Sequence, residues 1–381
     1  MAEFGFYEFF AGGGMARAGL GPGWRCLFAN DFDPKKAASY RANWGGEGLH
    51  VGDVAALTAS VLPSRADLVW ASFPCQDLSL AGAGAGLKGE RSGAFWPFWR
   101  LMRELRQVGR APKAIVLENV CGLLTSHGGR DFVELCNALA EGGYRFGAMV
   151  IDAALFVPQS RPRLFVVALD AAGPVPRMAK LGPNRTWHPS ALRAAHDRMP
   201  QVTASKWLWL APALPAKRNT ALIDLIQDDP EHVPWHDDVV TEHLLAMMSA
   251  TNRRKVLEAQ LANRRVVGAV YKRTRVEAGK RVQRAEVRFD GLSGCLRTPG
   301  GGSSRQTILM VEGGRIKSRL ISARETARLM GLPDDYVLPK AYNEAYHLTG
   351  DGLVVPVVRY IAEEIVVPMM LQSDRQPACA A

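Results

Sequence analysis

The chain has 381 residues, of which 48% are hydrophobic and 22% charged, a balance typical of a globular protein with room for two domains. Its net charge of +10 favours a polyanionic partner over an acidic protein or a neutral small molecule. No apolar run approaches the roughly 20 residues of a membrane span, and the six cysteines include no Cys-x-x-Cys pair. We therefore expect an intracellular protein with reduced thiols, no zinc site and no other metal site.

The first 170 residues alternate short apolar runs with amphipathic stretches. The apolar runs predict strands at 4–9, 25–30, 68–72, 114–117, 145–151 and 164–169. The amphipathic stretches predict helices at 35–43, 95–108 and 130–141. This order predicts a doubly wound, mostly parallel, Rossmann-like α/β sheet.

The second half of the chain has a different character. Residues 171–250 are rich in proline and predict a connector, whereas 253–288 carry twelve basic residues against three acidic ones. A helix is predicted at 322–330, and 353–371 predict a strand or turn followed by a helix that returns to the first domain. We expect a catalytic domain at 1–210, a smaller basic domain at 211–344, and a segment at 345–381 that completes the first.

A glycine loop follows the first predicted strand. Such a loop lets the backbone approach a ligand closely, although a simple tight turn would use the same residues. Asp31 comes just after the predicted strand 25–30, where an acid can bind ribose hydroxyls, and Asp53 follows a further probable strand between 25–30 and 68–72. Either acid alone would more often be a helix cap. Together they predict a site for an adenosine-containing cofactor. Its residues are Phe10, Ala11, Gly12, Gly13, Gly14, Met15, Asp31, Phe32, Asp53 and Val54.

Three further segments carry reactive or charged groups at predicted strand ends. Cys75 follows the predicted strand 68–72, although a lone cysteine is usually a small buried hydrophobe. Glu118 stands at the end of the neighbouring predicted strand 114–117, where partial desolvation raises the pKa of a carboxyl, and its alternative role is a helix cap. Arg161 and Arg163 flank a proline before the predicted strand 164–169, and alternation predicts both guanidinium groups on one face.

In order and spacing, the segments FAGGGM, FPCQ, ENV and QSRPR resemble the motifs of the cytosine-5 DNA methyltransferases. Residues 324–334 are similar to the helix that packs the two domains of that family, and 350–356 to its C-terminal cofactor segment. The unmatched stretch, about 171–295, is where the family keeps its target-recognition domain. Asp351 stands where members usually have asparagine, which puts one cofactor contact in doubt.

The resemblance implies transfer of a methyl group from S-adenosylmethionine to carbon 5 of a flipped cytosine in double-stranded DNA. Cys75 would attack carbon 6, Glu118 would bind N3 and the exocyclic amine, Arg163 and Arg161 would contact the base carbonyl or hold these groups, and Asn119 would order the backbone. Pro74 and Asp351 join the implied cofactor site. The implied DNA contacts are Gln76, Ser79, Arg91, Arg273, Arg275, Arg297 and Thr298.

Rival functions stay open at this point. One branch of the resembling family acts on tRNA, a catalytically silent DNA-binding regulator would keep the fold, and a small-molecule methyltransferase would leave the basic region unexplained. For the preferred function we expect a monomer in a prokaryotic cytoplasm, associated with the nucleoid. A cognate restriction endonuclease would act separately.

Overall fold

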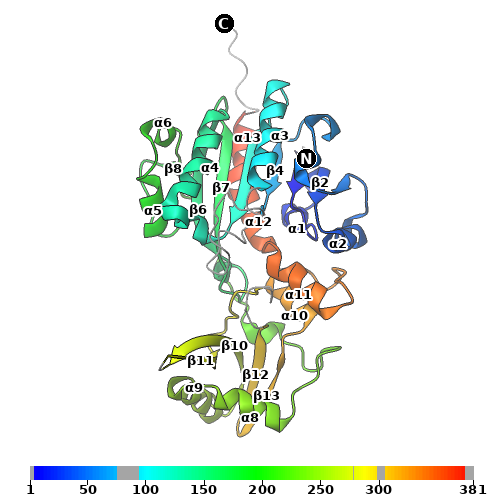
Figure 1. Ribbon diagram of the computed structural model, residues 1–381, viewed down its shortest axis with the longest axis vertical. Helices are drawn as coiled ribbons and strands as arrows, with labels where there is room; N and C mark the ends of the chain where they lie inside the picture. The colour runs from blue at the N-terminus through cyan, green and yellow to red at the C-terminus, as the bar shows by residue number, and fades with distance from the viewer. Residues whose placement is uncertain (1–3, 75–93, 278, 298–304, 374–381) are drawn as a thin grey trace. The chain divides into compact units, whose positions relative to one another are not determined.

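The computed structural model describes residues 4–74, 94–277, 279–297 and 305–373. The chain divides into two compact units (Figure 1). The larger unit comprises Met1–Asp152, Pro162–Ala216 and Val355–Ala381, and the smaller comprises Ala153–Arg161 and Lys217–Val354. The expected domain boundaries, after residues 210 and 344, lie six and ten residues before the changes of unit after Ala216 and Val354.

A seven-stranded sheet forms the centre of the larger unit. Its strands, in spatial order, are β3 (Leu49–Val51), β2 (Trp24–Asp31), β1 (Phe4–Phe9), β4 (Leu68–Ala71), β5 (Ala114–Asn119), β7 (Pro162–Asp170) and β6 (Tyr144–Asp152). The first five are parallel, while β7 runs antiparallel to both of its neighbours. The predicted doubly wound, mostly parallel α/β sheet is confirmed.

The direction of β7 follows from its connection to β6. Parallel neighbours need a crossover of a dozen residues or more. The link here is 153–161, which holds only the short 3-10 helix η7 (Ala153–Leu155). The antiparallel turn places the start of β7 beside the end of β5, and Leu164 pairs with Asn119.

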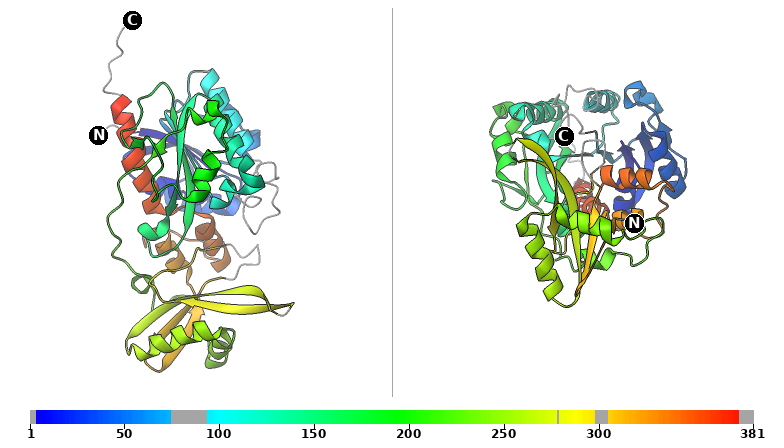
Figure 2. Two further views of the ribbon diagram at one scale, coloured as in Figure 1. Left: turned by 90° about the vertical axis from the view of Figure 1, so that its left-hand side faces the viewer. Right: turned by 60° about the horizontal axis from the view of Figure 1, so that its bottom comes forward.

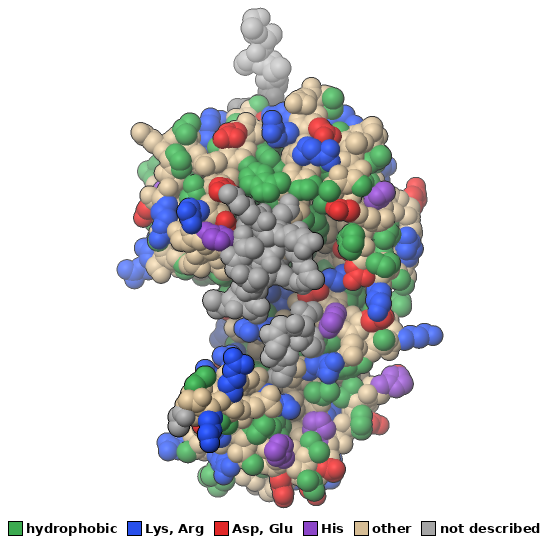
Figure 3. Space-filling view, in the orientation of Figure 1, with side chains coloured by type: hydrophobic (Ala, Val, Ile, Leu, Met, Phe, Trp, Pro, Cys, Tyr) green, Lys and Arg blue, Asp and Glu red, His purple; other side chains and the backbone are tan. Residues whose placement is uncertain are grey.

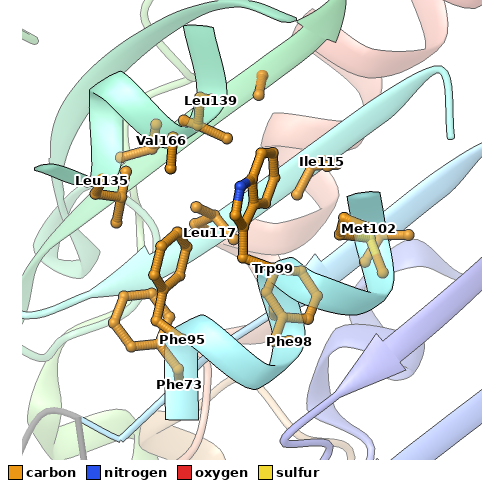
Figure 4. Packing of buried hydrophobic residues seen from close by; sticks show 14 of the residues in the cluster. Phe73, Phe95, Phe98, Trp99, Met102, Ile115, Leu117, Leu135, Leu139 and Val166 are labelled. Carbon is orange, nitrogen blue, oxygen red and sulfur yellow. The ribbon is translucent and has the colours of Figure 1, made fainter. Parts of the chain in front are cut away.

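Helices cover both faces of this sheet (Figure 2). On one face α3 (Phe95–Gln107) and α4 (Arg130–Glu141) bury their apolar sides, and α4 has the predicted bounds. Phe95, Trp99 and Leu135 pack there against Leu117 and other strand residues (Figure 4). Burying such side chains contributes about 1.5–3 kcal/mol each, so this layer holds the carboxyl ends of β4 and β5 in place.

The opposite face carries a helix from late in the chain. The helix α12 (Val355–Ile361) continues through a π-helical turn, η9 (Ala362–Val366), into α13 (Val367–Ser373). The start of 353–371 is a short non-helical link of Leu353 and Val354, not a strand, and the stretch is helical from Val355. Its apolar residues recur at helical spacing and are buried. The predicted return to the first domain is confirmed, whereas residues after 373 lie outside the described part.

Short elements complete the larger unit. The helix α1 (Met15–Leu20) follows the glycine loop, and α2 (Pro34–Trp44) follows β2. Two 3-10 turns, η1 (Val54–Ala56) and η2 (Ala59–Val61), follow β3, and two more, η5 (Cys121–Leu124) and η6 (Ser126–Gly129), follow β5. The expected connector contains α5 (Ser190–His196), α6 (Gln201–Ala204), and the paired strands β8 (Ala179–Lys180) and β9 (Trp209–Leu210).

The smaller unit is built on a four-stranded antiparallel sheet in the order β11-β10-β12-β13. These strands are β10 (Arg265–Glu277), β11 (Lys280–Arg288), β12 (Thr307–Glu312) and β13 (Arg315–Leu320). The helices α8 (Asp238–Ala246) and α9 (Ala250–Leu261) pack on it around Leu244, Val256 and Leu309. The remaining helices are α7 (Leu222–Leu225), α10 (Ala323–Leu329) and α11 (Tyr342–Asp351).

Candidate active site

The glycine loop between β1 and α1 has an unusual backbone. Phe10, Gly12 and Gly14 have φ angles of 58°, 56° and 78°, and a side chain at Gly14 would collide with Trp44, 2.4 Å from its indole nitrogen. Within the described part of the chain, nothing lies within 4 Å of a Cβ built at Gly12, and these residues leave this side of the loop open. The Trp44 indole N–H donates to the Gly13 carbonyl (3.0 Å) and fixes the loop from behind.

Asp31 connects this loop to the end of β2. The Gly12 N–H donates to Asp31 Oδ2 (2.7 Å), and the Asp33 N–H donates to Oδ1 (2.8 Å). Burial raises the pKa of the Asp31 carboxyl above its ordinary value, while these two amide hydrogen bonds oppose the shift. A carboxylate has about four acceptor positions, so Asp31 retains capacity for ligand hydroxyls. Phe32 beside it exposes 73% of its surface, as a ring available for stacking would.

The second predicted acid, Asp53, has a local partner. Its carboxylate accepts from the Ala55 N–H (2.8 Å) and so begins η1, while Val54 is buried. Asn30 fixes this segment from β2, since its amide donates to the His50 and Gly52 carbonyls. Asp53 is exposed and acts as a helix cap in the structure, and its predicted cofactor contact stays a prediction.

Glu118 and Arg163 form an ion pair at the carboxyl end of β5. Arg163 Nε lies 3.2 Å from Glu118 Oε1, with side-chain exposures of 18% and 11%. The pair forms because β7 is antiparallel to β5, which brings the beginning of one strand to the end of the other. The arrangement holds a carboxyl group in fixed orientation at the rim of the sheet.

Asn119 joins this pair to the neighbouring strand. Its amide donates to the Phe73 carbonyl (3.3 Å), and its side-chain oxygen accepts from the Val120 N–H (2.9 Å). The parallel register that pairs Leu117 with Ala71 brings Phe73 and Pro74 to the same rim. The expectation that Asn119 orders the local backbone is consistent with both bonds.

Arg161 has a different set of partners from Arg163. Its guanidinium donates to the Leu296 carbonyl (3.1 Å) and to the Gly350 and Gly352 carbonyls (2.9 Å each), and the residue is 3% exposed. Arg161 stands one residue before β7, and the expectation that both guanidinium groups share one face stays a prediction. Arg161 fixes the two carbonyls that flank Asp351, an exposed residue at the end of α11.

Several predicted residues lie outside the described part of the chain. These are Cys75, Gln76, Ser79, Arg91 and Thr298. Of the other predicted DNA contacts, Arg273 and Arg275 lie near the tip of β10, and Arg297 is exposed in the segment after β11.

Sequence reasoning missed two titratable groups near these segments. Glu8 in β1 is 2% exposed and accepts from the Ala16 N–H (3.1 Å) at the start of α1, and burial raises its pKa to about 8. An acid inside an otherwise apolar strand was the available signal. Cys121 follows Glu118 by three residues, and burial raises the pKa of its thiol while Arg163 opposes the shift. A protonated thiol is a poor nucleophile, so burial makes this cysteine less reactive.

Two features point to an α/β enzyme with a ligand site at the carboxyl edge of its sheet. One is the glycine loop that is hydrogen-bonded to Asp31, and the other is the Glu118–Arg163 pair where β5 ends and β7 begins. The family model for C-5 cytosine-specific DNA methylase matches residues 4–367. The chain belongs to that family, and its enzyme class is that of the DNA cytosine-5 methyltransferases.

Individual relatives match over nearly the whole chain. Type II methyltransferase M.HhaI of Haemophilus parahaemolyticus is 26% identical over 364 residues, which cover 94% of this chain and 93% of the relative. Type II methyltransferase M.HpaII of Haemophilus parainfluenzae is 26% identical over 372 residues, which cover 95% and 89%.

Solved structures share the fold. The S. pombe Dnmt2 methyltransferase has a TM-score of 0.59 at 18% identity, and the match covers 96% of this chain and 99% of that one. A putative DNA modification methyltransferase encoded within an E. coli prophage has a TM-score of 0.57 at 16% identity, with 98% and 100% covered. In the described residues, no helix combines the length and the apolar character that a membrane span requires.

Proposed function

We propose that this enzyme transfers a methyl group from S-adenosylmethionine to carbon 5 of a cytosine in a specific duplex DNA sequence, through a covalent adduct of Cys75. The observation that carries the proposal is the ion pair between Glu118 and Arg163, whose atoms Oε1 and Nε are 3.2 Å apart. Glu118 lies on β5, the neighbour of β4, and Cys75 follows β4 in the sequence. Family membership supplies the reaction class, and this pair supplies a carboxyl group and a guanidinium where a base would bind.

The loop between β1 and α1 fits the methyl donor. The open side of Gly12, the carboxylate of Asp31 and the exposed ring of Phe32 offer backbone approach, hydroxyl binding and stacking to an adenosine. Bound S-adenosylmethionine would supply an electrophilic methyl group on a sulfonium. We assign its binding to the loop residues 10–15, together with Asp31, Phe32, Asp53, Val54, Pro74 and Asp351.

Cytosine needs activation because its carbon 5 is a weak nucleophile. Addition of the Cys75 thiolate to carbon 6 breaks the 5,6 double bond and turns carbon 5 into an enamine-type nucleophile. After methylation of carbon 5, a base removes the carbon 5 proton. Elimination of the Cys75 thiolate then restores the double bond. The enzyme is regenerated without any change of oxidation state.

The described residues would hold the base during these steps. Glu118 would bind the exocyclic amine and deliver a proton to N3 as negative charge develops in the ring. Arg163 would orient Glu118 and contact the base carbonyl, while Asn119 would hold the Phe73 carbonyl and so the approach to Cys75. Arg161 would act as a positioning residue through the backbone that it binds.

Duplex DNA is the substrate that the charge distribution favours. The target base must leave the stack, which costs a few kcal/mol. The proposed DNA contacts are Gln76, Ser79, Arg91, Arg273, Arg275, Arg297 and Thr298. We infer a monomer that acts on DNA in a prokaryotic cytoplasm, and the type II names of its relatives make a separate restriction endonuclease the candidate companion.

The test compares methyl incorporation into duplex DNA and into tRNA by the wild type and by Cys75→Ser. We expect incorporation into duplex DNA only, and its loss in Cys75→Ser with DNA binding retained. Cys136→Ser is the matched control, since this thiol lies on the buried side of α4. Activity on tRNA alone would refute the substrate, and full activity of Cys75→Ser would refute the mechanism.

A further inference from the structure

The strands β10 and β11 continue beyond the core of the smaller unit as a two-stranded ribbon. Tyr271 and Lys272 are partly buried, and every residue from Arg273 to Glu277 is exposed. We define the outer ribbon as residues 273–277 and 280–284. It carries five basic side chains against one acidic one, and Figure 3 shows Lys and Arg side chains gathered over this element. Such a charge excess points to a polyanion.

The strand register gives the outer ribbon two different faces. Arg273 pairs with Arg284, and Arg275 with Val282, so these side chains project to one side together with Tyr271 and Glu286. We call this side the guanidinium face. The opposite side carries Lys272, Thr274, Val276, Arg281 and Gln283 and is called the lysine face. The two sides differ in composition.

Two carboxylates fix the three arginines of the guanidinium face. Arg273 Nε lies 3.4 Å from Glu286 Oε2, and Arg275 forms an ion pair with the same carboxylate. Arg284 Nε donates to Glu277 (2.8 Å). In addition, the Arg273 guanidinium lies 5.0 Å from the centre of the Tyr271 ring. The guanidinium groups are therefore held in set directions while remaining accessible, with about half of the Arg273 and Arg275 side chains exposed.

Fold stability does not account for this arrangement. Exposed ion pairs contribute little to the free energy of unfolding. Moreover, Arg273 and Arg284 are directly opposite in the register, and like charges at such positions are unfavourable. A simple solvated face would not need its arginines oriented. A polyanion would relieve the repulsion, and oriented guanidinium groups match the paired acceptors of guanine.

We propose that the outer ribbon enters the major groove of the target duplex with its guanidinium face toward the base edges, where Arg273, Arg275 and Arg284 recognise guanine. Glu277 and Glu286 are positioning residues, and the lysine face contacts phosphates. A major groove is wide enough for a two-stranded ribbon. This inference rests on the proposed DNA substrate and assigns sequence recognition to particular side chains within it.

The experiment contrasts the two faces with matched double variants, Arg273→Gln/Arg275→Gln and Lys272→Gln/Arg281→Gln. Each removes two charges from the same stretch of ribbon. Binding to a panel of duplex oligonucleotides is measured across salt concentrations, and methylated sites are mapped by bisulfite sequencing in an unmethylated host. The guanidinium-face variant should lose at least about 10-fold in discrimination at a guanine position. The lysine-face variant should bind all sequences more weakly, with a salt slope reduced by about two, and keep its recognition sequence.

Glu286→Gln separates positioning from charge. It leaves the ribbon more basic, so non-specific binding should hold or increase while discrimination at the guanine position falls. An equal, sequence-independent loss in both double variants would overturn the proposal, as would unchanged discrimination in Glu286→Gln. The deciding outcomes are read from DNA binding by variants that keep Cys75, so they are distinct from failure of the Cys75 mechanism, which abolishes methyl transfer but leaves the binding preference measurable.

Discussion

Each unit of this protein contains a glutamate–arginine pair, and the two pairs differ in everything except their chemistry. Glu118 and Arg163 in the larger unit expose 11% and 18% of their side chains. Glu325 and Arg319 in the smaller unit expose none. The partly exposed pair stands at strand ends, where a ligand can reach it, whereas the buried pair is enclosed in protein. The difference in exposure indicates that Glu118 and Arg163 are accessible to a ligand, whereas Glu325 and Arg319 stabilise the fold.

The hydrogen bonds of the buried pair support this distinction. Glu325 completes a capping box with Ser322 at the start of α10 and accepts from the Gln227 N–H (2.7 Å) as well as from Arg319 (2.9 Å). Arg319 also donates to the Gln227 and Leu320 carbonyls. A buried charge needs hydrogen-bond partners of this kind, because its desolvation costs several kcal/mol. The pair therefore connects β13, α10 and the segment after α7.

The largest effect on activity is expected at the partly exposed pair of Glu118 and Arg163. Glu118→Gln keeps the shape of the side chain but removes its charge and its proton, and should lower the rate of methyl transfer by at least about 100-fold. Its free energy of unfolding should change by no more than about 1 kcal/mol, because the pair is partly solvated. Methylation assays and urea unfolding measure the two quantities. Glu104→Gln on α3 is the control, and an equal activity loss there would contradict the assignment.

The buried pair should show the reverse. Arg319→Met leaves Glu325 buried without its arginine and should reduce the free energy of unfolding by about 3–5 kcal/mol. Trp235 provides a local fluorescence probe, since its ring lies 4.8 Å from the Arg319 guanidinium. Arg328→Gln, at the exposed pair with Asp334, is the control and should cost less than about 1 kcal/mol. Similar losses of unfolding free energy in Arg319→Met and Arg328→Gln would show that burial does not determine how much each pair stabilises the protein.

Glu8 is a third buried glutamate, and the described part of the structure contains no ion pair to it. Its folded pKa of about 8 lies above the ordinary value of 4.5. Its stabilising contribution is therefore complete below pH 4.5 and is lost as the pH rises through about 8. Between pH 4.5 and about pH 8, the free energy of unfolding of the wild type should fall by a few kcal/mol because of Glu8. Glu8→Gln should remove this dependence of stability on pH. Urea unfolding across this pH range tests it, with Glu104→Gln as control; an unchanged slope in Glu8→Gln would refute the assignment.

The sequence predicted those features that local patterns determine. The helix at 130–141 has its observed bounds because its apolar residues recur at helical spacing, and the adjacent placement of β4 and β5 followed from their order. By contrast, the partners of Arg161 are Leu296, Gly350 and Gly352, each more than 130 residues away. No local signal encodes such contacts.

The ribbon was also beyond local patterns. Residues 253–288 showed their charge but not their pairing, because alternating arginines suit a solvated helix or loop as well as a strand. The Glu118–Arg163 contact depends on the direction of β7, which the short link from β6 decides. In both cases long-range strand pairing places the side chains.

The helix α12 has a consequence for synthesis on the ribosome. It packs on α1 so closely that a Cβ at Gly19 would lie 2.4 Å from Val358. These two residues are separated by the entire smaller unit in the order of translation. The smaller unit can therefore leave the exit tunnel and fold first, while the larger unit waits for one side of its sheet to be covered. A nascent chain stalled before Val355 would expose that apolar face to chaperones.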